Sequence, residues 1–185
     1  MQTFPAAAVG SGLFNHPAVL TRPSQRLPLY GITWDDESSG NTSEVSFPVA
    51  YATDFSASAL SLLVAVDATN TELNPPGLDQ TMTVILTDSH GNEVAVDIPA
   101  GTPALSSHPG TFVEREGFVG TMQIWEGYTP LGELRIPMHK FVSAQLANGF
   151  TEFDLESITE IALQFTPGTA GAIMLQNAYL IPIAD

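Results

Sequence analysis

The sequence lacks cysteine, and it has only five lysine and arginine residues against 20 aspartate and glutamate residues. Without thiols, the chain cannot form disulfides, thiolate metal sites or a cysteine nucleophile. Its formal net charge of -15 repels phosphate backbones, so nucleic acid is not an expected partner. Long apolar runs are also missing, because none approaches the roughly 20 residues that a membrane span needs. We therefore expect a globular protein without a membrane span.

Sequence patterns of common enzyme classes are missing as well. There is no Gly-x-Ser-x-Gly nucleophile motif, and no two of the four histidines have the i, i+4 spacing of a helical zinc site. His16 and His108 each precede a proline and His90 lies in a turn-like segment, so we interpret these histidines as solvated. A glycosidase pair of carboxylates stays open as an alternative, since its two members can lie far apart in sequence.

A chain of 185 residues fits one domain. Residues 1–26 are rich in Pro, Ala, Gly and Ser and have neither a strand nor a helix period, which predicts a linker-like extension. Residues 27–185 carry short runs rich in Val, Ile, Leu, Phe and Thr, with turn residues between them, and are predicted to form one β-sandwich domain. The start does not read as a signal peptide, so we expect any export signal further upstream in a longer protein.

The most regular runs are interpreted as strands. Residues Ala59 to Val66 are apolar on both faces, which predicts a central strand. Residues 82–87 and 94–98 flank the Gly-containing segment Asp88 to Asn92, which predicts a hairpin. Further strands are expected at residues 121–125, 134–136, 158–165 and 172–181, a helix at residues 139–147, and a single helical turn at residues 53–57. Pro48, Pro99, Pro137 and Pro182 are expected at strand edges, ends or bulges, because proline cannot donate to a central ladder.

Five segments read in order, over about Val45 to Ile181, resemble the galactose-binding-like jelly-roll domains of carbohydrate-binding modules and of accessory domains in secreted bacterial hydrolases. The five are FPVAYATDFSASALSLLVAVD, MTVILTDSHGNEVAVDIP, GELRIPMHKF, FDLESITEIALQF and GAIMLQNAYL. The typical motifs correspond to Arg135-Ile136-Pro137-Met138 with Phe141, then Asp154-Leu155 through Ile158, Ile161 and Phe165, then Ile173 to Leu180. The resemblance implies an antiparallel jelly-roll-like β-sandwich with a non-catalytic role. We expect Asp154 to cap a single turn ahead of a strand whose Ile161, Leu163 and Phe165 share one face. Gln176-Asn177 stand where such domains often have paired aspartates, which weakens an inference of calcium.

Aromatic rings are the candidate ligand contacts, since a flat ring stacks on a sugar with little loss of side-chain entropy. The candidates are Trp34, Trp125 and Tyr128, although these rings could instead close the core at the ends of a sandwich. The run Asp35, Asp36 and Glu37 is the candidate for a structural calcium site, with a solvated loop as the alternative. No cofactor is required by these patterns.

These observations favour a secreted, extracellular and monomeric accessory module rather than an enzyme. Its expected partner is a carbohydrate or another polymer surface, or a catalytic domain to which it is linked. One alternative is a structural or adhesive module whose strand edges mediate assembly. Another is a small glycosidase or lyase, which would need two carboxyls with shifted pKa values in one cleft.

Overall fold

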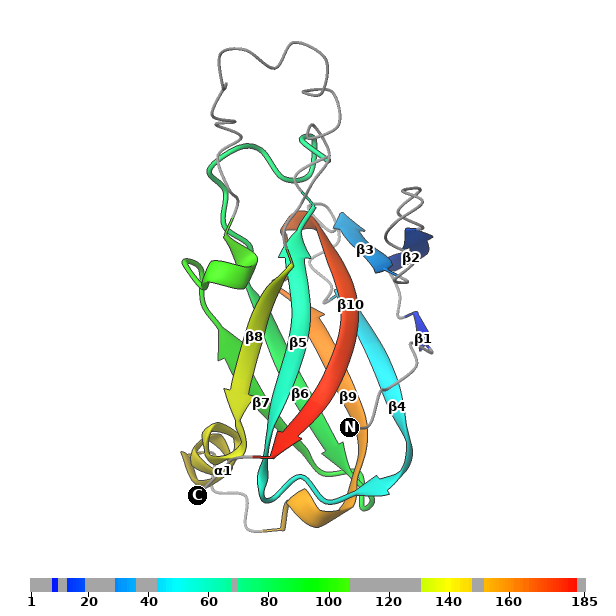
Figure 1. The fold of residues 1–185 in the computed structure, drawn as a ribbon, viewed down its shortest axis with the longest axis vertical. Helices are drawn as coiled ribbons and strands as arrows, with labels where there is room; N and C mark the ends of the chain where they lie inside the picture. Colours follow the sequence, from blue (N-terminus) through cyan, green and yellow to red (C-terminus); the bar gives the residue numbers. More distant parts are fainter. Residues whose placement is uncertain are drawn as a thin grey trace, which may run out of the picture.

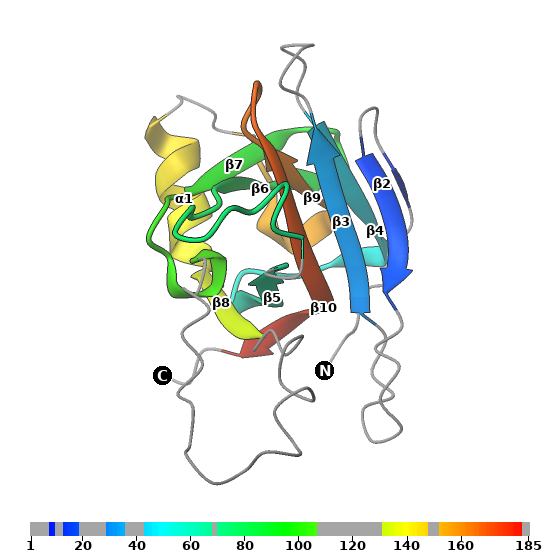
Figure 2. The same cartoon turned by 90° about the horizontal axis from the view of Figure 1, so that it is seen from above.

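Among the described residues of the computed structural model, ten strands build two antiparallel five-stranded sheets. The structure describes residues 8–9, 13–18, 29–35, 43–67, 70–106, 131–147 and 152–182. Sheet A has the strand order β2-β3-β10-β5-β8, and sheet B has the order β1-β4-β9-β6-β7. Figure 1 shows β8, β5 and β10 lying in front of β7, β6 and β9, and Figure 2 shows the same two layers from above. The predicted antiparallel β-sandwich is confirmed.

The strand bounds match the strongest sequence patterns. The strands of sheet A are β2 (Leu13–Ala18), β3 (Leu29–Asp35), β5 (Ser58–Val66), β8 (Gly132–Pro137) and β10 (Ala170–Pro182). The strands of sheet B are β1 (Ala8–Val9), β4 (Ser43–Thr53), β6 (Met82–Asp88), β7 (Glu93–Ile98) and β9 (Ile158–Phe165). β5 pairs with neighbours on both sides, as its two apolar faces predict. The predicted strand at residues 121–125 lies outside the described residues.

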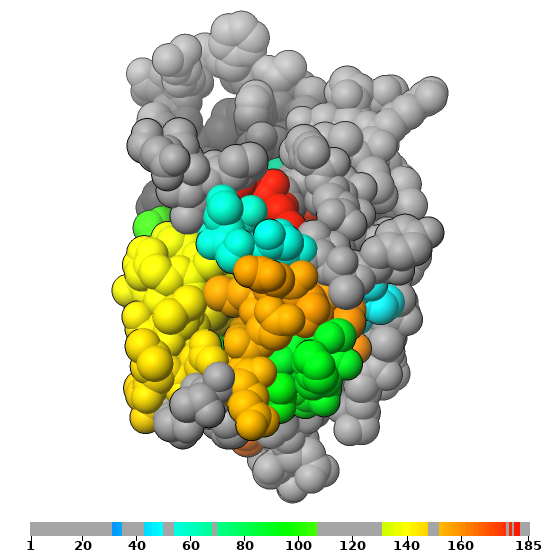
Figure 3. Space-filling view, turned by 90° about the horizontal axis from the view of Figure 1, so that it is seen from below, coloured from blue at the N-terminus to red at the C-terminus, as the bar shows by residue number. Residues whose placement is uncertain are grey.

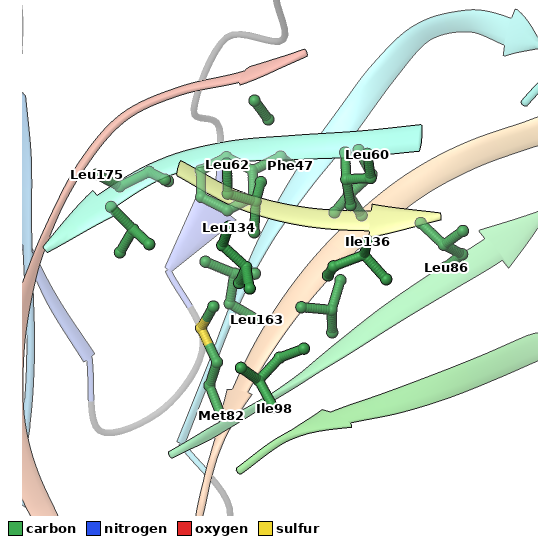
Figure 4. Packing of buried hydrophobic residues seen from close by; sticks show 14 of the residues in the cluster. Phe47, Leu60, Leu62, Met82, Leu86, Ile98, Leu134, Ile136, Leu163 and Leu175 are labelled. Carbon is green, nitrogen blue, oxygen red and sulfur yellow. The ribbon is translucent and has the colours of Figure 1, made fainter. Parts of the chain in front are cut away.

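The core fills the space between the sheets. Alternate residues of a strand point to opposite faces, and the strand residues of the core cluster come from β3 to β10. Figure 4 shows labelled side chains from both sheets meeting there, among them Leu60 and Leu134 from sheet A and Met82 and Leu163 from sheet B. Ile161, Leu163 and Phe165 all belong to the core, so their predicted common face is confirmed.

Helical segments are short and lie at the ends of strands. The α-helix α1 (Met138–Ala147) follows β8 directly and buries Met138 and Phe141. Among the described residues, the 3-10 helices are η1 (Pro103–Leu105) and η3 (Leu155–Ser157). Asp154 caps η3 by accepting a hydrogen bond from the Glu156 backbone N–H at 2.9 Å, as predicted. Within the described part of the chain, no helix has the length and hydrophobicity that a bilayer span requires.

The structure departs from the local sequence patterns in two segments. Residues 53–57 do not form a helical turn: Thr53 ends β4, and a simple turn leads into β5, since Asp54 accepts hydrogen bonds from the Ser56 backbone and hydroxyl. Part of residues 1–26 pairs with the sheets, because β1 pairs with β4 and β2 pairs with β3. Backbone pairing of this kind needs no alternating apolar pattern, so the composition did not reveal it. The boundary of a linker within this stretch stays a prediction.

Candidate functional site

The outer face of sheet B is the candidate site, because polar side chains from four strands line up across it. The inward residues of β4, β9, β6 and β7 belong to the core, so the residues between them face outward. Strand registers place the outward residues in rows that cross the strands. The first row consists of Glu44, Gln164, Thr83 and Asp97. The middle row consists of Ser46, Ala162, Ile85 and Ala95. The third row consists of Pro48, Glu160, Thr87 and Glu93.

The three rows form an amphipathic surface, which we call the trough. Neighbouring rows are separated by two residues along each strand, or about 7 Å, and neighbouring strands by about 4.8 Å. The middle row carries small or apolar side chains, with Ala162 and Ile85 buried and Ala95 exposed. The first and third rows carry carboxylate, amide and hydroxyl groups on either side of it. A ligand with an apolar face and polar edges would match this pattern.

Hydrogen bonds hold the side chains of the first row in place. The Gln164 amide donates to the Glu44 carboxylate at 3.2 Å. On the other side of the row, the Thr83 hydroxyl donates to the Asp97 carboxylate at 2.7 Å. Side chains that are already ordered lose less conformational entropy when a ligand binds. The first row is therefore a preorganised set of polar groups.

An open hollow of about 370 Å³ lies at the same end of the sheet. Thr83, Asp97 and Gln164 of the first row line it, together with residues beyond the ends of β6, β7 and β9, which include Thr81, Pro99 and Pro167. The Thr81 and Thr166 hydroxyls lie 2.9 Å apart at its edge and share a hydrogen bond. Concave surfaces with a few convergent polar groups are the usual form of small-ligand sites.

Trp34 lies in the core rather than at the surface. Its ring is 1% exposed and stacks on Phe165 of sheet B, with ring centroids 3.9 Å apart and an angle of 16° between the planes. The indole Nε1 donates to the Thr169 hydroxyl at 3.2 Å. Gly171 stands opposite Trp34 in the ladder, and a Cβ atom on this glycine would lie 2.2 Å from the ring. This position favours the interpretation in which Trp34 closes the core at one end of the sandwich.

The other predicted site residues are mostly outside the described residues. Trp125, Tyr128, Asp36 and Glu37 all fall there, while Asp35 ends β3 opposite Ala170. Among the residues that the structure describes, no group of three or more histidine or acidic side chains could hold a metal ion. The calcium site and the two aromatic contacts therefore stay predictions. His90 and His139 are both exposed.

Sequence reasoning missed the trough residues. Their only signal is the alternation of polar and apolar residues, as in Glu93, Ala95 and Asp97, and any solvated sheet face has the same alternation. What distinguishes the trough is the alignment of rows, which depends on registers such as Glu44 with Gln164. Those two residues are 120 positions apart in the chain.

Comparisons with known proteins bear on the fold. No protein-family model matches the sequence, and no curated protein matches it. The family 11 carbohydrate-binding module of the cellulosomal cellulase Lic26A-Cel5E of Clostridium thermocellum is similar in structure, with a TM-score of 0.53 and 9% identity over 100% of this chain and 91% of that chain. The family 30 module of the cellulase Cel9D-Cel44B of the same organism has a TM-score of 0.59 and 9% identity over 97% of this chain and 87% of that chain.

A third similar structure is the family 11 module from Clostridium thermocellum in complex with a β-1,3-1,4-mixed-linked tetrasaccharide. Its TM-score is 0.53 and its identity is 10%, over 96% of this chain and 88% of that chain. In each case nearly the whole of one chain matches nearly the whole of the other. At identities of 9–10%, the likeness is one of fold. The chain has the β-sandwich jelly-roll fold that these carbohydrate-binding modules have.

Proposed function

We propose that this protein is a non-catalytic carbohydrate-binding module that holds a single glycan chain in the trough of sheet B. The observation that carries the proposal is the match of the whole chain to whole carbohydrate-binding modules. One of these similar modules is in complex with a mixed-linked tetrasaccharide. A shared fold can host different functions, so the proposal also needs a suitable site on this chain.

The trough has the chemistry that a glycan needs. A pyranose ring presents C–H groups on its faces and hydroxyl groups around its edge. Among the apolar side chains of the middle row, Ala95 is exposed and suits a ring face, and the polar rows on both sides can exchange hydrogen bonds with the hydroxyls. A chain that follows the middle row would cross the strands, and the first row and the hollow beside Thr83, Asp97 and Gln164 would lie along one side of it.

The same comparison supports a proposal for the wider setting. Two of the similar modules belong to cellulases, so we propose that this module serves as an accessory to a secreted hydrolase and works outside the cell as a monomer. Trp125 and Tyr128 remain candidates for stacking on the sugar. Their contribution can be measured with Trp125→Ala and Tyr128→Ala in the binding experiment described next.

The direct test is binding of the full chain to a panel of neutral polysaccharides by affinity electrophoresis and calorimetry. The panel contains mixed-linkage β-glucan, hydroxyethylcellulose, xylan, mannan and agarose. Ala95 lies exposed in the middle row, so Ala95→Arg should block the trough and weaken binding about tenfold or more. Gln164→Ala removes an amide of the first row and should weaken binding about fivefold.

Ala57→Arg is the matched control. It adds the same side chain at an exposed position in the turn between β4 and β5, outside the three rows of the trough, and should leave the affinity unchanged. The proposal fails if the protein binds none of the glycans in the panel. It also fails as a statement about the trough if Ala95→Arg binds as tightly as the wild type.

A further inference from the structure

The trough is acidic, and none of the basic residues that the structure describes belongs to its three rows. Its rows contain the carboxylates of Glu44, Asp97, Glu160 and Glu93, and none of their residues is lysine or arginine. In the described part of the chain, the lysine and arginine residues are Arg135 in β8 of sheet A and Lys140 in α1. The net charge of -15 adds a repulsive field for any anion that approaches.

Two of these carboxylates occupy the exposed edge of the trough. Glu93 and Asp97 lie on β7, the edge strand of sheet B, with Ala95 of the middle row between them. All three residues are exposed. A glycan along the middle row would thus pass between two carboxylates, each about 7 Å from the row in the strand direction. Ionised carboxylates only accept hydrogen bonds, so they suit hydroxyl groups and repel carboxylate or sulfate groups.

Asp97 also has a fixed position, which strengthens this effect. The Thr83 hydroxyl holds it at 2.7 Å, and both residues line the hollow beside the first row. A like charge placed near a fixed carboxylate costs more than one placed near a mobile side chain that can turn away. Specificity between related ligands often depends on such repulsion of the wrong ligand as much as on attraction of the right one.

Resting on the proposed function, we infer that the trough selects uncharged glycans and that Glu93 and Asp97 are the residues that reject anionic ones. Uronate-bearing, carboxymethylated and sulfated chains are excluded even where their backbone fits. The selection acts through charge, so it depends on ionic strength. Salt shortens the reach of exposed charges from roughly 30 Å at 0.01 M to about 3 Å at 1 M.

The test compares hydroxyethylcellulose with carboxymethylcellulose, which share a backbone and differ in charge. If wild type binds hydroxyethylcellulose, it should bind carboxymethylcellulose about tenfold more weakly at about 20 mM salt, and the ratio should fall below about threefold at about 500 mM salt. The variant E93Q/D97N should lower the ratio to about threefold at low salt. The measured quantity is the ratio of the two dissociation constants, whatever the absolute affinity of the variant.

A matched control separates the trough from the charge of the whole molecule. The variant E72Q/E156Q removes the same two charges at exposed positions in the loop after β5 and in η3, and should leave the ratio at its wild-type value. If the control lowers the ratio as much as E93Q/D97N does, net charge discriminates and the inference is wrong. It is equally wrong if wild type binds both polymers alike. If wild type binds no neutral glycan in the panel above, the proposed function itself fails.

Discussion

The two ends of the sandwich are closed by different chemistry. At the end that carries the hollow, Trp34 of sheet A stacks on Phe165 of sheet B, so an aromatic pair joins the two sheets. At the other end, the buried carboxylate of Asp88 joins the β6–β7 turn to the segment before η3. Figure 3 views this second end, where α1 (yellow), the η3 region (orange) and the β6–β7 turn (green) lie side by side.

The Asp88 side chain is 1% exposed and accepts four hydrogen bonds. Its donors are the backbone N–H groups of His90, Asn92 and Asp154 and the side-chain amide of Asn92, at 2.8–3.1 Å. Burial by itself would raise the pKa of this carboxyl, but the four hydrogen bonds outweigh burial and hold the pKa below its ordinary value. The Trp34–Phe165 stack itself contains no ionisable group. Acid should therefore loosen one end and leave the other intact.

The largest expected effect is at the aromatic end. Trp34→Ala removes a fully buried indole that packs on Phe165, and should lower the free energy of unfolding by about 4 kcal/mol. Urea denaturation at neutral pH measures this loss. The control is Leu146→Ala on α1, where the side chain is 70% exposed and the change should stay within about 0.5 kcal/mol. A loss below about 1 kcal/mol for Trp34→Ala would show that the stack does not hold this end.

The next effect concerns the glycine beneath the indole. A Cβ at position 171 would come within 2.2 Å of the Trp34 ring, so Gly171→Ala should cost about 3 kcal/mol through overpacking. Most of this cost should vanish in the Trp34→Ala background, where the new methyl group has room. The double-mutant cycle should therefore show a coupling of about 2 kcal/mol between the two positions. Additive losses would contradict the close approach of this pair.

The third prediction concerns the carboxylate end. Asp88→Asn replaces one oxygen by an amide that cannot accept hydrogen bonds, and should lower the free energy of unfolding by about 2 kcal/mol at pH 7. Because the folded pKa of Asp88 is lowered, its charge stabilises the fold above the unfolded pKa of about 4, and this contribution is lost as pH falls through the folded pKa. The difference between wild type and Asp88→Asn should therefore shrink in acid.

Urea denaturation at pH 7, 5 and 3 measures this change. The loss caused by Trp34→Ala should remain constant over the same range, since no titrating group takes part in the stack. The contrast between the two ends is wrong if the Asp88→Asn loss is as large at pH 3 as at pH 7. It is also wrong if the Trp34→Ala loss shrinks in parallel.

Local patterns predicted much of the fold. The strand at residues 158–165, the hairpin around residues 88–92 and the Asp154 cap all follow from alternation and from turn and capping residues close in sequence. The prolines also behave as predicted: Pro48 stands at a register shift of β4, and Pro137 and Pro182 end their strands. The short strands β1 and β2 were not predicted, because edge pairing uses backbone groups that any sequence has.

The candidate site could not be predicted from local patterns. Trp34 stands beside an acidic run in the sequence, which suggested an exposed ring, but the register of β3 with β10 places it over Gly171 in the core. The trough depends in the same way on which residues of β4, β9, β6 and β7 face one another. Registers between distant strands come from the whole fold, and a single sequence without its fold does not specify them.

The smallest effect separates stacking from hydrogen bonding at the aromatic end. Thr169→Val removes the oxygen that accepts from the Trp34 indole at 3.2 Å and donates to the Thr166 carbonyl at 2.7 Å, and should cost about 1 kcal/mol in urea denaturation. Thr169→Ser keeps the hydroxyl and should stay within about 0.5 kcal/mol of wild type. If Thr169→Val instead costs as much as Trp34→Ala, this end depends on a polar group just as the Asp88 end does. The two ends would then differ in charge alone, and only their response to pH would tell them apart.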